Sequence, residues 1–335
     1  MTVVASERAT AREALSAYGK QTIKQGSKSF ALASLLFGRE MQADAQMLYA
    51  WCRHCDDVID GQSMGEDAPD AAMTKGERRR RLARLREQTR ASLKGEYVGE
   101  QAFDAFAEVA RRHRMPEQYP FDLLNGFAMD AEEVRFETLN DTLRYCYGVA
   151  GVVGIMMAIL MGVDRDDEET LDRACDLGLA FQLTNICRDI YDDARAGRVY
   201  VPAQILTGEG VPAEPASILD PANKEAVWKA ALKLLDIADE YYASATSGVR
   251  RLPPRAAAAV AAARNIYRDI GRRIREGGPD VWRGRVAVSG PRKASLALAG
   301  LATGAPASIF LRRSQTPPRN ALWSRKSIRG AADCS

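Results

Sequence analysis

Apolar residues recur at intervals of three and four along almost the whole chain. Two clear series are Leu48, Trp51, Cys52, Cys55 and Ile59, and Leu171, Ala174, Cys175, Gly178 and Phe181. This period places the apolar side chains on one face of an α-helix, and no stretch sustains the alternation typical of a β-strand. The pattern predicts an all-α protein of about eight to ten helices.

Breaks between these helices are predicted where turn-forming residues gather. They fall at Gly61–Thr74, Gly95–Gly99, Met115–Pro120, Gly162–Asp167, Gly197–Pro221, Leu252–Pro254 and Gly277–Gly290. No unit repeats at the period of roughly 20 to 50 residues that is typical of solenoids. We therefore expect one compact helical domain over residues 1–282.

Composition and charge add a distinct C-terminal segment. Hydrophobic residues make up 46% of the 335 residues and charged residues 27%, which fits a globular protein. Residues 283–335 contain ten Lys or Arg and one acid, Asp333, so this segment carries +9 and the rest −6 of the net +3. We predict a basic extension that is either solvated and disordered or in contact with an anionic surface such as a membrane. Nucleic-acid binding is not expected, because the Arg-rich runs lack a recognition motif and interleaved aromatics.

The N-terminus predicts a cytoplasmic protein. Residues 1–15 contain acids and arginines where a signal peptide requires an apolar core. Two uncharged stretches, Tyr147–Val163 and Ala294–Leu311, approach the length of a membrane span, but both contain glycines and Pro306 interrupts the second. We interpret the first as a buried helix and the second as a docked or interfacial helix.

The stretch 47–60 places polar side chains on one helical face. Tyr49, Arg53, Asp56 and Asp60 follow at steps of four, three and four, with Asp57 beside them. The surrounding residues are apolar, and burying carboxylates there is costly unless a cation is present. This face is therefore expected to meet a positive charge.

The same arrangement returns in the stretch 177–202. Gln182, Asn185, Asp189 and Asp193 follow at steps of three, four and four, and Arg188 flanks them. Carboxylates one turn apart can reach ions in one cleft, and Mg²⁺ suits them because it prefers hard oxygen ligands and shares substrate phosphates. Two such faces predict a two-sided magnesium site.

Two further segments are less specific. Gly148, Gly151 and Gly154 lie three residues apart in an apolar run, and they fit close helix packing as well as a groove for a hydrocarbon chain. The segment GSKSF at 26–30 is typical of a helix cap followed by a solvated lysine.

Together these segments resemble the squalene and phytoene synthase family, and within it the bacterial phytoene synthases. The likeness runs from about Ser27 to Arg275. It rests on SKSF, YAWCRHCDDVID, GFAMD, DTLRYCYGVAGVVG, DLGLAFQLTNICRDIYDDARAGRVYVP and ARNIYRDIG. The resemblance implies a single-domain isoprenoid synthase helical bundle, with two aspartate motifs facing each other across a central cavity.

The resemblance also implies roles for individual residues. Asp56, Asp60, Asn185, Asp189 and Asp193 are expected to bind Mg²⁺, with Mn²⁺ as an alternative ion and no need for NADPH. The residues expected to contact the substrate are Gly26, Ser27, Lys28, Ser29, Phe30, Tyr49, Arg53, Gln182, Asn185, Arg188 and Tyr267. The four aspartates, Arg53 and Tyr267 are the expected catalytic residues. Phe30, Phe127, Tyr145 and Tyr147 are candidates for stabilising positive charge, or plain core residues.

The implied reaction joins two molecules of geranylgeranyl diphosphate head to head, through prephytoene diphosphate, to phytoene in carotenoid biosynthesis. Two alternatives stay open. A squalene or dehydrosqualene synthase would use farnesyl diphosphate at the same metal site, and a non-catalytic assembly or scaffold relative would be expected to lose the aspartates. The implied partners are the inner membrane, contacted peripherally through the basic extension, and downstream carotenoid enzymes.

Overall fold

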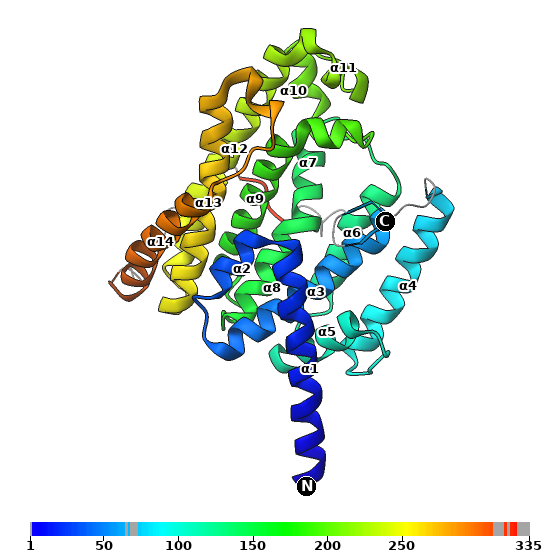
Figure 1. Ribbon diagram of the computed structural model, residues 1–335, viewed down its shortest axis with the longest axis vertical. Coiled ribbons are helices and arrows are strands. Elements are labelled where there is room, and N and C mark those ends of the chain that lie inside the picture. The colour runs from blue at the N-terminus through cyan, green and yellow to red at the C-terminus, as the bar shows by residue number, and fades with distance from the viewer. Residues whose placement is uncertain (1, 64–65, 68–72, 311–317, 320–321, 327–335) are drawn as a thin grey trace.

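The computed structural model describes residues 2–63, 66–67, 73–310, 318–319 and 322–326 (Figure 1). These residues are almost entirely helical, which confirms the all-α prediction; β1 (Gln62–Ser63) and β2 (Glu66–Asp67) form a small antiparallel hairpin. The α-helices are α1 (Thr2–Gly26), α2 (Lys28–Ser34), α3 (Arg39–Asp60), α4 (Lys75–Leu93), α5 (Gln101–His113), α6 (Gln118–Ala131), α7 (Leu139–Cys146), α8 (Val152–Leu160), α9 (Glu168–Arg195), α10 (Ala203–Gly208), α11 (Pro215–Leu219), α12 (Lys224–Val249), α13 (Pro254–Gly277) and α14 (Gly290–Phe310). A π-helix, η1 (Tyr147–Gly151), joins α7 to α8, and η2 (Pro221–Asn223) and η3 (Gly278–Arg283) are 3₁₀-helices.

The helix boundaries follow the predicted breaks. For example, α3 ends at Asp60 and α4 begins at Lys75, on either side of the break predicted at 61–74. The predicted number of helices was too low, because the described residues form fourteen α-helices. Two of the additional helices, α10 and α11, are only one to two turns long, too short for a period to show in the sequence.

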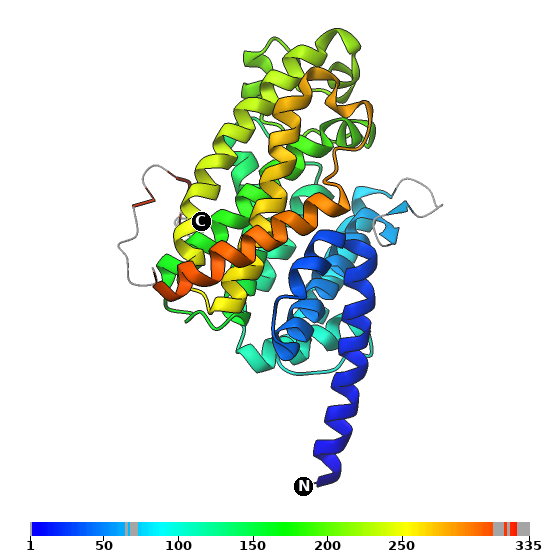
Figure 2. The same cartoon turned by 60° about the vertical axis from the view of Figure 1, so that its left-hand side comes forward.

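Two long helices, α3 and α9, occupy the centre of the bundle and carry the two acidic motifs. α9 packs against α8, η1, α12 and α13, whereas α3 packs against α1, α5 and α6 (Figure 1). The N-terminal part of α1 projects beyond the rest of the bundle, and α14 lies along the outside of α13 (Figure 2). The fold therefore places α3 and α9, which are more than 100 residues apart in the sequence, together at the centre of the bundle.

The glycines around η1 serve close helix packing. A Cβ atom added to Gly126 of α6 would lie 2.6 Å from the backbone of Gly148, and one added to Gly151 would lie 2.6 Å from the Leu179 side chain. At Gly154 it would collide with the carbonyl oxygen of Ala174 in α9. These contacts support the first of the two interpretations, in which the glycines allow helices to pack closely.

The first of the two uncharged stretches is a core segment. Among the described residues, one helical run, Leu139–Leu160, is long and apolar enough to cross a membrane, and 72% of its most apolar window is buried inside the protein. This agrees with the buried helix predicted around residues 147–163. Residues 294–310 of the second stretch form most of α14.

The described part of the basic extension packs on the bundle. A Cβ atom on Gly300 of α14 would lie 2.5 Å from the Cα atom of Ala262 in α13, so the two helices are in close contact. Arg292, near the start of α14, donates a 2.9 Å hydrogen bond to the buried Asp269 of α13. The domain boundary at residue 282 stays a prediction, whereas α14 is shown to be fixed to its neighbour.

The residues after α14 include a segment that is inserted into the bundle. We call residues 318–326 the C-terminal strap, of which 318–319 and 322–326 are described. Arg325 is only 2% exposed and donates hydrogen bonds to Asp172 at 2.7 Å, to Glu168 at 2.6 Å and to the Tyr119 hydroxyl at 3.1 Å. One arginine thus neutralises acids at the start of α9 and ties that helix to α6.

Two more strap residues extend this attachment. Arg319 donates two hydrogen bonds to Asp176 of α9, at 2.9 and 2.6 Å. The Trp323 backbone N–H donates to the Tyr241 hydroxyl of α12 at 3.3 Å, and its ring packs against Tyr147 of η1. Because Asp176 is fully buried, the strap arginine adds to the charge of Arg173, the buried arginine of α9 that also acts on this acid.

Replacing Arg325 by Gln is expected to lower the free energy of unfolding by about 3–5 kcal/mol, because it leaves Asp172 in the protein interior without its main partner. Urea denaturation measures the change. The Arg325→Gln/Asp172→Asn double variant is expected to recover much of the loss, and Arg285→Gln, at an exposed position, serves as the control. An Arg325→Gln variant as stable as the unmodified protein would contradict the structural role of the strap.

Candidate active site

The first acidic motif lies on the last turns of α3, as its spacing predicts. Arg53 donates to Asp57 at 2.5 Å and forms an ion pair with Asp56 at 3.3 Å. Gly61, at φ +69°, ends the helix directly after Asp60. The helix therefore ends with a group of carboxylates, two of which are held by an arginine of the same helix.

The second motif lies near the C-terminal end of α9. Arg188 donates to both carboxylate oxygens of Asp189, at 2.7 and 2.5 Å. One turn earlier, the Asn185 amide nitrogen donates to Gln182 at 3.3 Å. The Asn185 Oδ1 atom is buried and has no hydrogen-bond partner in the described part of the chain, which marks it as an acceptor available to a ligand.

A helix-ending turn joins the second motif to the first. Gly197, at φ +77°, reverses the chain after α9, and its N–H and that of Arg198 bond to the carbonyl oxygens of Ala194 and Asp193 at 3.0 and 2.8 Å. This turn directs Arg198 to the opposite helix, where it donates to Asp60 at 2.6 Å. The two acidic motifs therefore lie opposite each other with Arg198 between them, and we call the region between them the cleft.

A further carboxylate in the cleft was not selected from the sequence. Asp130, the last residue of the GFAMD segment, accepts hydrogen bonds from Tyr200 at 2.7 Å and from Tyr145 at 3.1 Å. The rings of Tyr145 and Tyr200 stack on each other at 4.8 Å. Tyr145 was a candidate for stabilising positive charge, and its hydroxyl here positions an acid.

Burial and crowding of these carboxylates raise their pKa values. Burial, and then the charge of Asp60, raises the pKa of Asp56 to about 7. Burial, and then the charge of Asp189, raises the pKa of Asp193 to about 8. Burial also raises the pKa of Asp130 to about 6, although the Tyr200 hydroxyl and Arg198 oppose the shift. The cleft therefore favours either protons or cations.

The other predicted substrate-binding residues lie beside the cleft on α1, α2 and α13. Tyr267 stacks on Phe181 at 4.1 Å, and the charges of Arg188 and Asp189 both act on its hydroxyl. Gly26 lies against Tyr49, because a Cβ atom at this position would collide with the Tyr49 hydroxyl.

The GSKSF segment supplies the beginning of α2. The Ser27 hydroxyl caps the helix by accepting the Phe30 N–H at 3.3 Å, so the predicted cap is confirmed. The Phe30 ring meets the Tyr49 ring edge-on at 5.7 Å. The side chains of Lys28 and Ser29 lie outside the described part of the structure, so their predicted contact with substrate stays a prediction.

The donor set of the cleft fits Mg²⁺. Its carboxylates and the free Asn185 amide oxygen are the hard ligands that this ion prefers. Within the described residues, no three Asp, Glu, His or Cys side chains lie close enough together to hold one ion alone. Each motif therefore suits ions that share their remaining positions with diphosphate oxygens and water.

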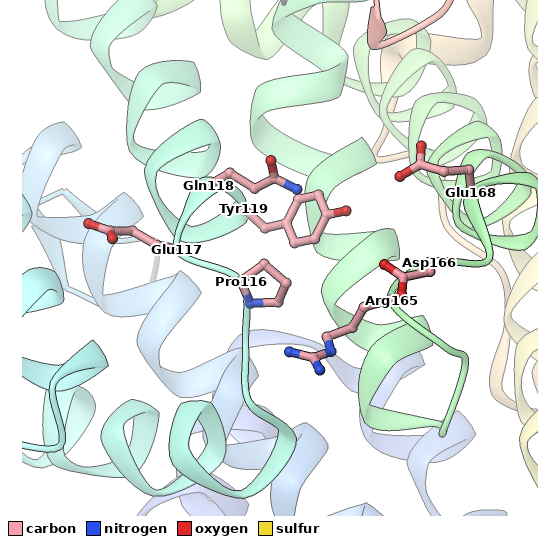
Figure 3. Close-up of a pocket in the computed structure, with 7 residues that line it drawn as sticks. All are labelled: Pro116, Glu117, Gln118, Tyr119, Arg165, Asp166 and Glu168. Atoms are coloured by element: carbon pink, nitrogen blue, oxygen red, sulfur yellow. The ribbon is translucent and has the colours of Figure 1, made fainter.

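A separate pocket lies at the opposite end of α9. It has a volume of about 470 Å³ and is lined by Pro116, Glu117, Gln118, Tyr119, Arg165, Asp166 and Glu168 (Figure 3). Glu168 is the first residue of α9, whereas Asp189 and Asp193 lie in its last turns. The pocket contains none of the predicted site residues, so it does not correspond to the predicted central cavity, which stays a prediction.

Comparison with known proteins gives a consistent result. The family model for squalene/phytoene synthase matches residues 23–292. The chain is 49% identical to the 15-cis-phytoene synthase of Pantoea ananas over 306 residues, covering 91% of this chain and 96% of that one. It is 48% identical to the 15-cis-phytoene synthase of a Paracoccus species, again covering 91% and 96%.

Solved structures show the same fold. A dehydrosqualene synthase crystallised with a ligand superposes with a TM-score of 0.70 at 26% identity, covering 87% of this chain and 96% of that chain. A squalene synthase from Alicyclobacillus acidocaldarius superposes with a TM-score of 0.68 at 23% identity, covering 80% and 95%. The central cleft therefore lies in the bundle shared by these enzymes.

The metal-free protein is expected to lose stability as the pH rises from about 5 to about 8. Asp56 and Asp193, with pKa values of about 7 and about 8, keep protons in the folded state that the unfolded chain has already released. Urea denaturation in the presence of a chelator measures this slope. In the Asp193→Asn variant, the free energy of unfolding is expected to fall less steeply with pH. An unchanged slope would contradict the raised pKa assigned to Asp193.

Proposed function

This chain belongs to the squalene/phytoene synthase family, and we propose that it acts as a 15-cis-phytoene synthase, joining two geranylgeranyl diphosphates head to head. The observation that carries the proposal is the cleft in which Arg198 of the second motif reaches Asp60 of the first. Identity of 49% to the Pantoea ananas enzyme over most of both chains supports the same activity. The product would be phytoene, a precursor in carotenoid biosynthesis.

The first chemical task of the cleft is to release diphosphate from an allylic substrate. Bound Mg²⁺ neutralises the charge that grows on this leaving group. The aspartates and Asn185 would hold the ions, while Arg53 and Arg188 lie on the two sides of the cleft and can donate to phosphate oxygens. The Tyr267 hydroxyl, beside Arg188, can add a further hydrogen bond.

The second task is to protect the allylic cation that remains. Water would convert it to an alcohol, so the reacting carbons must lie among apolar and aromatic side chains. The stacked rings of Phe181 and Tyr267 lie next to the second motif and can face positive charge. The same walls would serve again when the cyclopropane intermediate, prephytoene diphosphate, ionises and rearranges to the C40 product.

Two alternatives differ in substrate or in class. A dehydrosqualene or squalene synthase would use farnesyl diphosphate in a similar cleft, and the fold alone does not separate it from the proposal. The sequence favours the C20 substrate, because the relatives near 49% identity are 15-cis-phytoene synthases. A non-catalytic scaffold role is disfavoured, since all four motif aspartates are present and face one cleft.

We expect the purified protein to convert geranylgeranyl diphosphate and Mg²⁺ to a C40 hydrocarbon, detected by chromatography and mass spectrometry. Farnesyl diphosphate, with and without NADPH, tests the alternative. Asp60→Asn and Asp189→Asn are expected to lower turnover by orders of magnitude, because each removes a charge that offsets the metal.

Asp192→Asn is the matched control for these variants. Asp192 lies beside the second motif but is exposed and pairs with Arg195 at 2.7 Å, so turnover is expected to stay close to normal. A C30 product from farnesyl diphosphate in place of the C40 product would refute the substrate assignment. Near-normal turnover in Asp60→Asn would refute the metal assignment.

We also propose that the protein works at the cytoplasmic surface of the inner membrane, where a hydrocarbon product can pass to downstream carotenoid enzymes. The outer side of α14 supports this placement. Leu298 is 65% exposed, and Ile309 and Phe310 are 60% and 80% exposed. Lys293 lies at the start of the same helix, whose described residues include no acid. Exposed apolar residues on a helix without acids suit an anionic lipid surface.

The Leu298→Ser/Phe310→Ser variant is expected to bind less to vesicles containing anionic lipid in a flotation assay, because it removes exposed apolar area from α14. Tyr97→Ser, which changes a side chain that is 58% exposed elsewhere, is the control. This comparison leaves the strap in place, which removal of residues 283–335 would not. Equal flotation of the α14 variant and the control would exclude α14 as the contact.

A further inference from the structure

The motif carboxylates are mostly paired with arginines of the same chain. The pairs are Arg53 with Asp56 at 3.3 Å, Arg188 with Asp189 at 2.7 Å, and Arg198 with Asp60 at 2.6 Å. Asp193 forms no ion pair with a described residue, but the charge of Arg198 acts on it. Three of the four motif carboxylates therefore have an arginine partner before any ion enters.

Arg198 differs from the other two arginines in its position. Arg53 and Arg188 belong to the helices that carry their partners, three residues and one residue away. Arg198 follows the turn after α9 and reaches across to α3. Its charge also acts on Asp130 and Asp193, so a single guanidinium offsets carboxylates from three helices.

The backbone of Arg198 is fixed, whereas its side chain is free to move. Its backbone is fixed by the bond from its N–H to the Asp193 carbonyl oxygen, and the neighbouring Tyr200 carbonyl oxygen accepts from Thr142 at 3.0 Å. The side chain is about one-third exposed, so the guanidinium can leave Asp60 without unfolding the turn. A phosphate group in the cleft would offer it a stronger, forked partner.

We propose that Arg198 is a built-in counter-ion that occupies Asp60 until diphosphate arrives, so that binding of the divalent metal depends on diphosphate. Diphosphate draws the guanidinium to its oxygens, and Asp60 is released to bind the ion. In the absence of diphosphate, a metal ion must displace the guanidinium and meets its positive charge. Arg198 is thus a positioning residue that sets the order of binding, and this inference rests on the proposed function of the cleft.

The dependence is a coupling between two ligands and is therefore reciprocal. In the unmodified protein, Mg²⁺ is expected to bind weakly alone and much more tightly with inorganic diphosphate. Without the Arg198 charge, Mg²⁺ alone would meet an unpaired Asp60, and the difference between the two conditions would shrink.

The test is isothermal titration of MgCl₂ into the full-length protein, with and without inorganic diphosphate. Arg198→Gln is expected to bind Mg²⁺ alone about tenfold more tightly, the scale of one partly screened charge pair. Its gain in Mg²⁺ affinity on adding diphosphate is expected to fall by a similar factor. Unchanged Mg²⁺ affinity in the absence of diphosphate would overturn the inference.

Two further variants make this result specific. Arg198→Lys keeps a positive charge and is expected to bind Mg²⁺ alone as weakly as the unmodified protein; tight binding like that of Arg198→Gln would overturn the inference. Arg195→Gln removes an exposed arginine from the end of α9 and is expected to change neither affinity. Circular dichroism melting curves confirm that each variant is folded.

The outcome is separable from that of the proposed function. If the unmodified protein makes no C40 hydrocarbon from geranylgeranyl diphosphate, the proposed function fails. If it makes that product while Arg198→Gln and the unmodified protein bind Mg²⁺ alone equally well, only the counter-ion role fails.

Discussion

Repulsion between carboxylates in a partly buried cleft is the constraint on which the rest of the site depends. Asp56, Asp60, Asp130, Asp189 and Asp193 converge from three helices, and desolvation makes each additional negative charge more costly. Arginines and tyrosine hydroxyls donate hydrogen bonds to these carboxylates, and their pKa values are raised. The proposed role of Arg198 is that one of these counter-charges, its bond to Asp60, gives way to an ion that arrives with a substrate.

Helix α9 carries a group of acids at each end, and different arginines neutralise each group. Acids spaced by four residues occur at its beginning, at Glu168, Asp172 and Asp176, and again near its end, at Asp189 and Asp193. At the beginning, the strap arginines Arg325 and Arg319, with side chains 1% and 16% exposed, pair with the acids. At the end, Arg188 and Arg198 are 21% and 32% exposed. The acids at the two ends have the same spacing, so spacing alone does not separate a structural ion cluster from a site that can admit a ligand.

Much of this organisation could be predicted from the sequence, because helical spacing fixes which side chains share a face. The two acidic faces, the Ser27 cap and most helix boundaries follow from local pattern. Asp130 and Arg198 were missed, although both lie in segments recognised as part of the family resemblance. Their roles depend on contacts between helices, and the available signals were an acid ending the apolar GFAMD segment and an arginine directly after a helix-ending glycine.

The basic extension shows the limit of reasoning from charge. A count of Lys and Arg cannot distinguish a solvated arginine from one buried beside acids distant in sequence, and Arg325 pairs with a residue 153 positions away. That separation also has a consequence for biosynthesis. A ribosome makes α9 long before it makes the strap, so the nascent bundle holds Asp172 and Asp176 without their arginines. Final closure of this end of the molecule must therefore follow synthesis of the strap.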